Sequence, residues 1–107
     1  MNSLPTHVRI SYSQFHVQPM TAAEADEVGD GCCNLRDCVI KVNTTQSWQR
    51  QVETLWHEVK HAIHAHADLT DESKEEDFCT RAAPYELAVL VHNPKLVACI
   101  LSVCPAS

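Results

Sequence analysis

Hydrophobic and polar positions alternate through much of the first part of the chain. The β-branched and aromatic residues of segment 6–18 predict one or two strands that end at Pro19. Segment 38–43, with the letters CVIKVN, is the clearest strand candidate, and segment 31–35 is expected to pair with it as a hairpin. Between these strands, segment 21–28 predicts a short helical turn that its first residue, a threonine, caps.

From residue 45 the apolar positions change to helical spacing, and they fill an arc of roughly 120° on a helical wheel. We expect this helix to run from about Gln46 to about His66, with Thr44 or Thr45 as its N-cap. The residues of the apolar arc are Trp48, Val52, Leu55, Trp56, Val59, Ala62 and Ile63.

The last third of the chain predicts two further helices after a polar turn at 68–73. The first is expected over 73–92, with Pro84 kinking or restarting it, and the second, short and apolar, over 95–103. Strands followed by helices indicate an α+β domain, here a small antiparallel sheet at the N-terminus followed by three helices. A chain of 107 residues suits one domain, which we expect to span residues 1–107.

Charge and composition exclude several classes of protein. The chain has 8 Lys and Arg against 14 Asp and Glu, which gives a net charge of −6 and no electrostatic basis for non-specific binding of nucleic acid. No apolar run approaches the roughly 20 residues that span a bilayer, so no membrane segment is expected. The N-terminus lacks the layout of a signal peptide, and we therefore expect a cytoplasmic protein.

Six cysteines are many for this length, but none forms a C-x-x-C pair that would favour a separate zinc site. In the cytoplasm they should be reduced. Cys79 and Cys99 are expected to be small core residues. The role of Cys32, Cys33 and Cys38, which flank a predicted turn, stays open.

The predicted central helix carries the motif H-E-x-x-H at residues 57–61. Its two histidines, His57 and His61, lie one turn apart on one face and can reach the same Zn²⁺ ion. Glu58 is too displaced to be a third ligand, but it can reach a water molecule whose pKa the metal lowers toward about 7. It would then accept the proton of that water during attack on a carbonyl.

Chance and an ordinary polar helix face are the competing explanations for this motif. The composition gives an accidental match with a probability of roughly 0.03. On the helical wheel the apolar arc centres near Leu55, with His57 about 160° and His61 about 120° away from that centre. Histidines that served the core would lie inside the arc, so the remaining alternative is a solvated polar face.

A catalytic zinc site needs a third protein ligand. The metzincin pattern would place a glycine where this chain has His64 and a histidine where it has Ala67, so the pattern fails. A glutamate of the next helix is the remaining source, and the candidates are Glu72, Glu75 and Glu76.

We favour Glu76, because it continues an apolar stripe along the second helix, where a carboxylate needs a partner. The stripe consists of Cys79, Ala83, Leu87 and Leu90. The alternative is structural, because Ser73 and Glu76 have the spacing of a capping box, in which the carboxylate would bind the backbone of Ser73 and no metal.

Several segments together resemble small phage and bacterial H-E-x-x-H proteins, which are related to the ImmA/IrrE-like metallopeptidases, a family of the zincin-like class. The segments are CVIKVN, ETLWHEVKHAIHA, the acidic EED and LVHNPKLVA, and they cover roughly residues 36–100. The resemblance implies a minimal zincin-like fold, zinc bound by His57, His61 and Glu76, Glu58 as the base, and a peptide or protein substrate. The chain shows EEDFCTRAAP where the family has E-x-x-A-N-x-F-A.

The sequence therefore predicts a zinc metallopeptidase that hydrolyses a peptide bond. The first alternative is a non-catalytic protein of phage or mobile-element origin in which zinc stabilises a small domain for interaction with a partner. The second alternative is a metal-free α+β binding protein.

Overall fold

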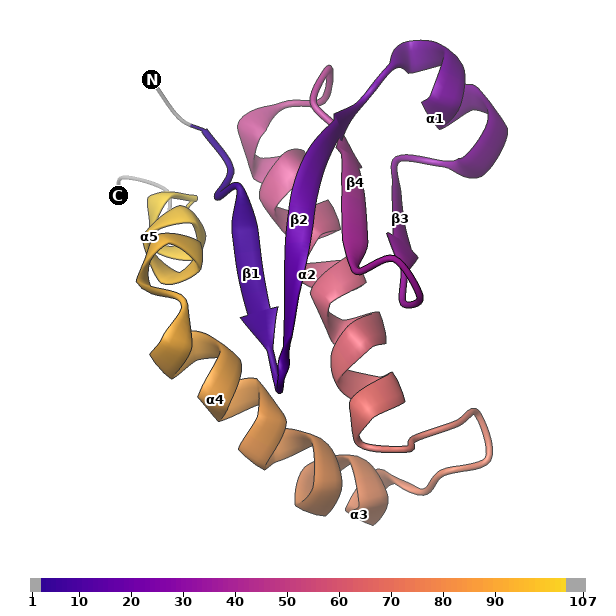
Figure 1. Cartoon of the computed structure of the whole chain (residues 1–107), viewed down its shortest axis with the longest axis vertical. Coiled ribbons are helices and arrows are strands. Elements are labelled where there is room, and N and C mark those ends of the chain that lie inside the picture. Colours follow the sequence, from indigo (N-terminus) through magenta and orange to yellow (C-terminus); the bar gives the residue numbers. More distant parts are fainter. Residues whose placement is uncertain (1–2, 104–107) are drawn as a thin grey trace.

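The computed structural model describes residues 3–103, which form a four-stranded sheet with the longest helix packed across one face (Figure 1). The strand order is β1-β2-β4-β3; β1 and β3 are antiparallel to their neighbours, whereas β2 and β4 are parallel. The α+β class is confirmed, but the prediction of an antiparallel sheet is wrong because the sheet is mixed. The strands are β1 (His7–Ile10), β2 (Ser13–Met20), β3 (Gly31–Asn34) and β4 (Val39–Asn43).

The helices follow the predicted order, with differences at their ends. Thr21 caps the first helix as expected, because its hydroxyl accepts a hydrogen bond from the Glu24 amide at 3.1 Å. The N-cap of the long helix is Ser47 and not Thr44 or Thr45. None of the described helices is long and apolar enough to cross a membrane. The helices are α1 (Ala22–Val28), α2 (Trp48–His66), α3 (Glu75–Asp77), a π-helical turn η1 (Phe78–Ala82), α4 (Ala83–His92) and α5 (Pro94–Ser102).

The parallel contact of β2 with β4 arises because the chain passes through α1 and β3 before it forms β4. Strand β2 also continues past Pro19, where we expected it to end, to Met20. Val17 donates its amide to the Thr6 carbonyl, so its N–H group points toward the side of β1. Because the backbone of a strand repeats every two residues, the nitrogen of Pro19 points to the same side. Because β1 begins only at His7, no strand needs the amide that proline lacks.

The core lies between the sheet and α2. The apolar arc predicted for the long helix is confirmed except at Trp48, which lies outside the core cluster. Leu55, Val59 and Ile63 are completely buried, and Trp56 packs against the same cluster. Helices α4 and α5 extend along the side of β1 and add Val89 and Leu96 to this core (Figure 1). The sheet contributes Val8, Ile10, Phe15, Ile40 and Val42.

The segment after α2 departs from the single helix expected over 73–92. It forms α3, the π-helical turn η1 and α4, with Pro84 in the first turn of α4. A π-helical turn contains more residues than an α-helical one, so it changes which side chains share a face. The expected stripe is therefore not buried: Cys79 and Leu87 are exposed, and the buried side carries Phe78, Ala82, Tyr85 and Val89 instead.

Arg81, in the π-helical turn, connects this segment to the end of α2. Its guanidinium group donates to the carbonyl oxygens of Ala67 at 2.7 Å and Asp68 at 2.8 Å. The last carbonyl groups of a helix lack partners within the helix, and a cation at this end is favoured by the helix dipole. Arg81 thus stabilises the C-terminus of α2 and connects it to the π-helical turn.

Asn93, between α4 and α5, connects the helices to the edge of the sheet. Its side chain accepts a hydrogen bond from the Arg9 amide at 2.8 Å and donates to the Arg9 carbonyl at 2.9 Å. It also donates to the Val89 carbonyl at 2.7 Å, and the residue is only 8% exposed. One amide group thus satisfies the backbone groups that β1 presents at Arg9.

We expect the substitution Asn93→Ala to lower the free energy of unfolding by about 2–3 kcal/mol, because it leaves partly buried backbone groups unpaired. The measurement is urea-induced unfolding followed by circular dichroism. The exposed neighbour provides the control: His92→Ala should change the stability by less than about 0.5 kcal/mol. Equal stability of the two variants would contradict a stabilising role for Asn93.

Candidate metal centre

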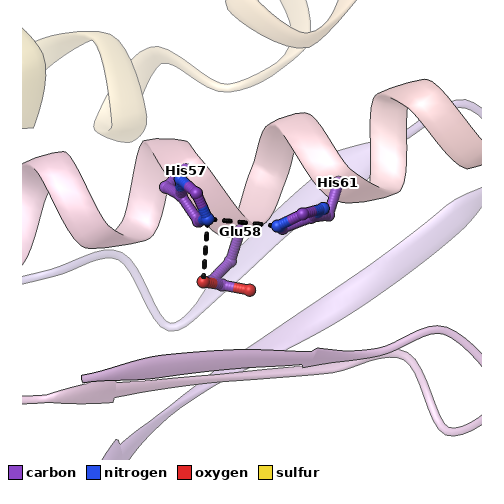
Figure 2. Close-up of side chains that lie close together, drawn as sticks. All are labelled: His57, Glu58 and His61. Atoms are coloured by element: carbon purple, nitrogen blue, oxygen red, sulfur yellow. Dashed lines mark hydrogen bonds and ion pairs between the residues drawn. The ribbon is translucent and has the colours of Figure 1, made fainter. Parts of the chain in front are cut away.

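His57 and His61 project from the exposed side of α2, and their rings point toward one another (Figure 2). The two Nε2 atoms lie 3.1 Å apart, and the ring planes are inclined by 80° with centroids 4.7 Å apart. One helical turn separates the residues, so the regular geometry of α2 alone brings the two nitrogens together.

This separation can be compared with the requirements of a metal ion. Two imidazole nitrogens bound to one tetrahedral zinc ion at 2.0–2.1 Å lie about 3.3 Å from each other. The observed Nε2 distance of 3.1 Å is close to that value, so a small adjustment of either ring allows both nitrogens to bind one ion. The pair therefore fits a metal of this kind.

Glu58 lies beside the histidines but in a different environment. Its side chain is 9% exposed, against 68% for His57, and Figure 2 shows it extending from the helix between the two rings. One carboxylate oxygen is 3.9 Å from His57 Nε2, and the three donor atoms lie within 4.8 Å of one another. The 3.9 Å distance exceeds the spacing of two ligands of one ion, and it suits a carboxylate that reaches the ion through a water molecule.

The Glu58 carboxylate accepts no hydrogen bond from any protein group among residues 3–103. Its carboxylate oxygens keep contact with solvent, because no fully buried side-chain oxygen among residues 3–103 lacks a hydrogen-bond partner. A largely buried side chain whose carboxylate still faces a cleft is typical of groups that bind a cation or act in catalysis. The exposed imidazoles and the buried acid together form a group that can hold a metal ion and also offer a base next to it.

Gly31 at the start of β3 allows the sheet to approach this group. A Cβ atom at this position would lie 2.5 Å from Thr54 Cγ2 and 3.1 Å from a carboxylate oxygen of Glu58. The strand therefore packs directly against the first turns of α2. The strand expected over 31–35 gave no indication of this contact.

The substitution Gly31→Ala should destabilise the fold by about 1–3 kcal/mol, because its methyl group overlaps Thr54 and crowds Glu58. Removing the Thr54 methyl with Thr54→Ser should recover part of that loss in the double variant. Chemical denaturation of the wild type, both single variants and the double variant gives the coupling energy. Strictly additive effects would show that the two residues are not in contact.

Cys33, two residues further along β3, lies in the same region. Burial, together with the negative charge of Glu58 and the nearby thiols of Cys32 and Cys38, raises the pKa of the Cys33 thiol to about 11. All three cysteines have free thiols. Cys33 is therefore a neutral thiol near neutral pH, and its titration depends on the carboxylate of the candidate site.

This dependence predicts slow alkylation of Cys33. At pH 8 roughly one Cys33 thiol in a thousand is ionised, so iodoacetamide should modify it more slowly than the exposed Cys79. The variant Glu58→Gln removes a negative charge, lowers the Cys33 pKa and should increase its rate without changing that of Cys79. Peptide mapping by mass spectrometry measures both rates, and an unchanged Cys33 rate in the variant would exclude electrostatic contact with Glu58.

An open cleft of about 330 Å³ extends from the group toward the N-terminal half of α2. His57 and Glu58 line one end, and Asp30, Arg50 and Glu53 bring charges to the rest. Arg50 and Glu53 form an ion pair at 3.6 Å. The cleft gives a second molecule access to the buried acid.

Glu76, the predicted third ligand, lies outside this group. Its side chain is exposed in α3 and accepts a hydrogen bond from the Thr80 hydroxyl at 3.2 Å. The capping-box alternative is wrong, because the Ser73 amide donates to the Thr70 carbonyl and not to Glu76, and the N-cap is Lys74, whose amide donates to Asp77. Glu72 and Glu75 are likewise exposed. The π-helical turn after α3 provides the physical reason, since it removes the apolar stripe on which the choice of Glu76 depended.

The face of α4 that turns toward α2 carries Glu86 instead, which sequence analysis did not single out. Its carboxylate lies 3.4 Å from the Lys60 ammonium group, next to the histidine pair along the helix. His64 stacks edge-on against Phe78 with ring centroids 5.2 Å apart. Partial burial, with the charge of Lys60, lowers the pKa of His64.

The two cysteines expected in the core have different environments. Cys99 is 7% exposed, which confirms the prediction, whereas Cys79 is exposed in the π-helical turn, so the prediction for it is wrong. The same change of helical face that displaces Glu76 explains the exposure of Cys79.

Comparisons of the chain with protein-family models, curated proteins and solved structures find no match. The resemblance to ImmA/IrrE-like metallopeptidases and the zincin-like description of the fold therefore stay predictions. Residues 3–103 form an α+β domain whose longest helix carries His57, Glu58 and His61 as a group that could hold a metal ion.

Proposed function

We propose that the protein is a zinc-dependent metallopeptidase that hydrolyses a bond in a peptide or protein substrate. The observation that carries the proposal is the Glu58 side chain, which is only 9% exposed and places a carboxylate oxygen 3.9 Å from Nε2 of His57, the histidine whose Nε2 lies 3.1 Å from that of His61. Imidazole suits zinc, and a two-histidine motif with an adjacent glutamate is typical of zinc hydrolases.

In the proposed reaction His57 and His61 have one role and Glu58 has another. His57 and His61 hold the ion, which supplies Lewis acidity to a water molecule and to the substrate carbonyl. Glu58 accepts a proton from the attacking water as the new C–O bond forms. It returns this proton to the leaving nitrogen when the C–N bond breaks. The cleft beside Glu58 and His57 is where the substrate would enter.

The substitution Glu58→Gln tests the assigned role. It keeps the size of the side chain and leaves both imidazoles in place, so bound zinc should be retained while hydrolysis falls about 10²–10⁴-fold. Zinc content is measured by elemental analysis and hydrolysis with unfolded casein or a mixture of quenched fluorescent peptides. A variant that retained wild-type activity would exclude Glu58 as the base.

The matched control removes the metal and keeps the base. His57→Ala should lose both stoichiometric zinc and hydrolysis, whereas the exposed His92→Ala should lose neither. Undiminished zinc in His57→Ala would contradict the assigned ligands.

The exposure of His57 and the position of Glu76 outside the group favour one second candidate, a zinc-stabilised interaction domain without catalysis. In that case zinc would raise the midpoint of thermal unfolding of the wild type, in proportion to its binding. The zinc-loaded wild type would then show no hydrolysis above that of Glu58→Gln. The same set of variants thus separates the two functions.

A further inference from the structure

A second pair of histidines faces away from α2. His7 on β1 and His16 on β2 are direct cross-strand partners, and both side chains are exposed. Their neighbours Val8 and Phe15 are buried in the core. Because side chains alternate along a strand, the histidines lie on the opposite face of the sheet from the candidate metal centre.

The hydrogen-bonding pattern brings these two side chains close. Val17 donates its amide to the Thr6 carbonyl, which makes the next pair along, His7 and His16, a non-hydrogen-bonded pair. His16 instead donates its amide to the Cys38 carbonyl beside β4. Side chains of a non-hydrogen-bonded pair approach more closely than those of a hydrogen-bonded pair.

The two rings are as close to each other as those of the first pair, although their inclination differs from the 80° found there. The centroids of His7 and His16 are 4.7 Å apart with the planes inclined by 63°, and the centroids of His57 and His61 have the same separation.

Thr6 orients one of the rings. Its hydroxyl lies 2.9 Å from His7 Nδ1. When the Nδ1–H group donates to this oxygen, Nε2 carries the free lone pair, as in metal-binding histidines whose second nitrogen donates to a neighbouring oxygen. The nearest cation along the strand, Arg9, directs its Nε to the Ser11 carbonyl at 3.4 Å.

We propose that His7 and His16 form a second metal-binding site, which takes a divalent transition-metal ion of the kind that prefers imidazole, such as Ni²⁺, Cu²⁺ or Zn²⁺. Water molecules complete the coordination of the ion. Binding here joins β1 to β2 and stabilises the folded state by mass action. The site is independent of the proposed hydrolysis, because none of its residues belongs to the group on α2.

The experiment uses the full chain with the substitutions His57→Gln and His61→Gln, so that the first pair cannot bind. Ni²⁺ is the probe, because it is paramagnetic and broadens the amide resonances of nearby residues in ¹H–¹⁵N NMR spectra. We expect saturable broadening centred on residues 6–8 and 15–17, and a rise in the midpoint of thermal unfolding with Ni²⁺ concentration. Adding His16→Gln should weaken binding by at least about tenfold.

The matched control is His92→Gln in the same background, which removes an exposed histidine of α4 and should leave Ni²⁺ affinity unchanged. The well-dispersed NMR spectrum of each variant confirms that it folds. The proposal is overturned by an absence of saturable broadening in β1 and β2, by broadening centred on the cysteines of β3, or by equal affinities with and without His16. None of these outcomes bears on zinc at His57 and His61, so the two sites are tested separately.

Discussion

The packing of one stripe of α2 against the sheet determines where every other group of the molecule lies. Leu55, Val59 and Ile63 are completely buried between the helix and the strands. Once this stripe faces the sheet, a rotation of 100° per residue leaves His57 and His61 on the solvent side. Glu58 then falls at the boundary, where the helix meets β3, and this position makes it buried while its two neighbours in the motif are exposed.

Much of the fold could be predicted because it follows from local patterns. The apolar period of α2, the capping threonine of α1 and the hairpin of β3 with β4 each depend on residues close together in sequence. The parallel pairing of β2 with β4 could not be predicted, because strand order depends on long-range packing and alternation carries no information about it. The π-helical turn could not be predicted either, because the segment FCTRA is equally compatible with an α-helix.

The candidate site likewise contains residues that could be predicted from the sequence and residues that could not. Two histidines four residues apart on a regular helix have only one relative placement, so His57 and His61 could be predicted from spacing alone. Gly31 and Cys33 act through contacts with α2 that join segments more than twenty residues apart, and no local signal indicates them. To choose Glu76 correctly one would need to know how the helix that carries it is oriented relative to α2. One extra residue in the π-helical turn η1 is enough to change which side chains face α2.

The side-chain amide of Asn93 forms the hydrogen bonds with the Arg9 backbone that a neighbouring strand would otherwise form. The backbone of the sheet is therefore paired at this point of its β1 edge by a side chain. An edge strand with unpaired backbone groups is a template on which another chain can extend the sheet. At β1 the Asn93 side chain occupies the backbone groups of Arg9, whereas β3 is the last strand on the other flank of the described sheet. The two flanks of the described sheet therefore differ at Arg9, where a side chain satisfies the edge of β1. Strand β3 is also the strand that brings Gly31 against Glu58, so a chain that extended the sheet at β3 would do so beside this acid.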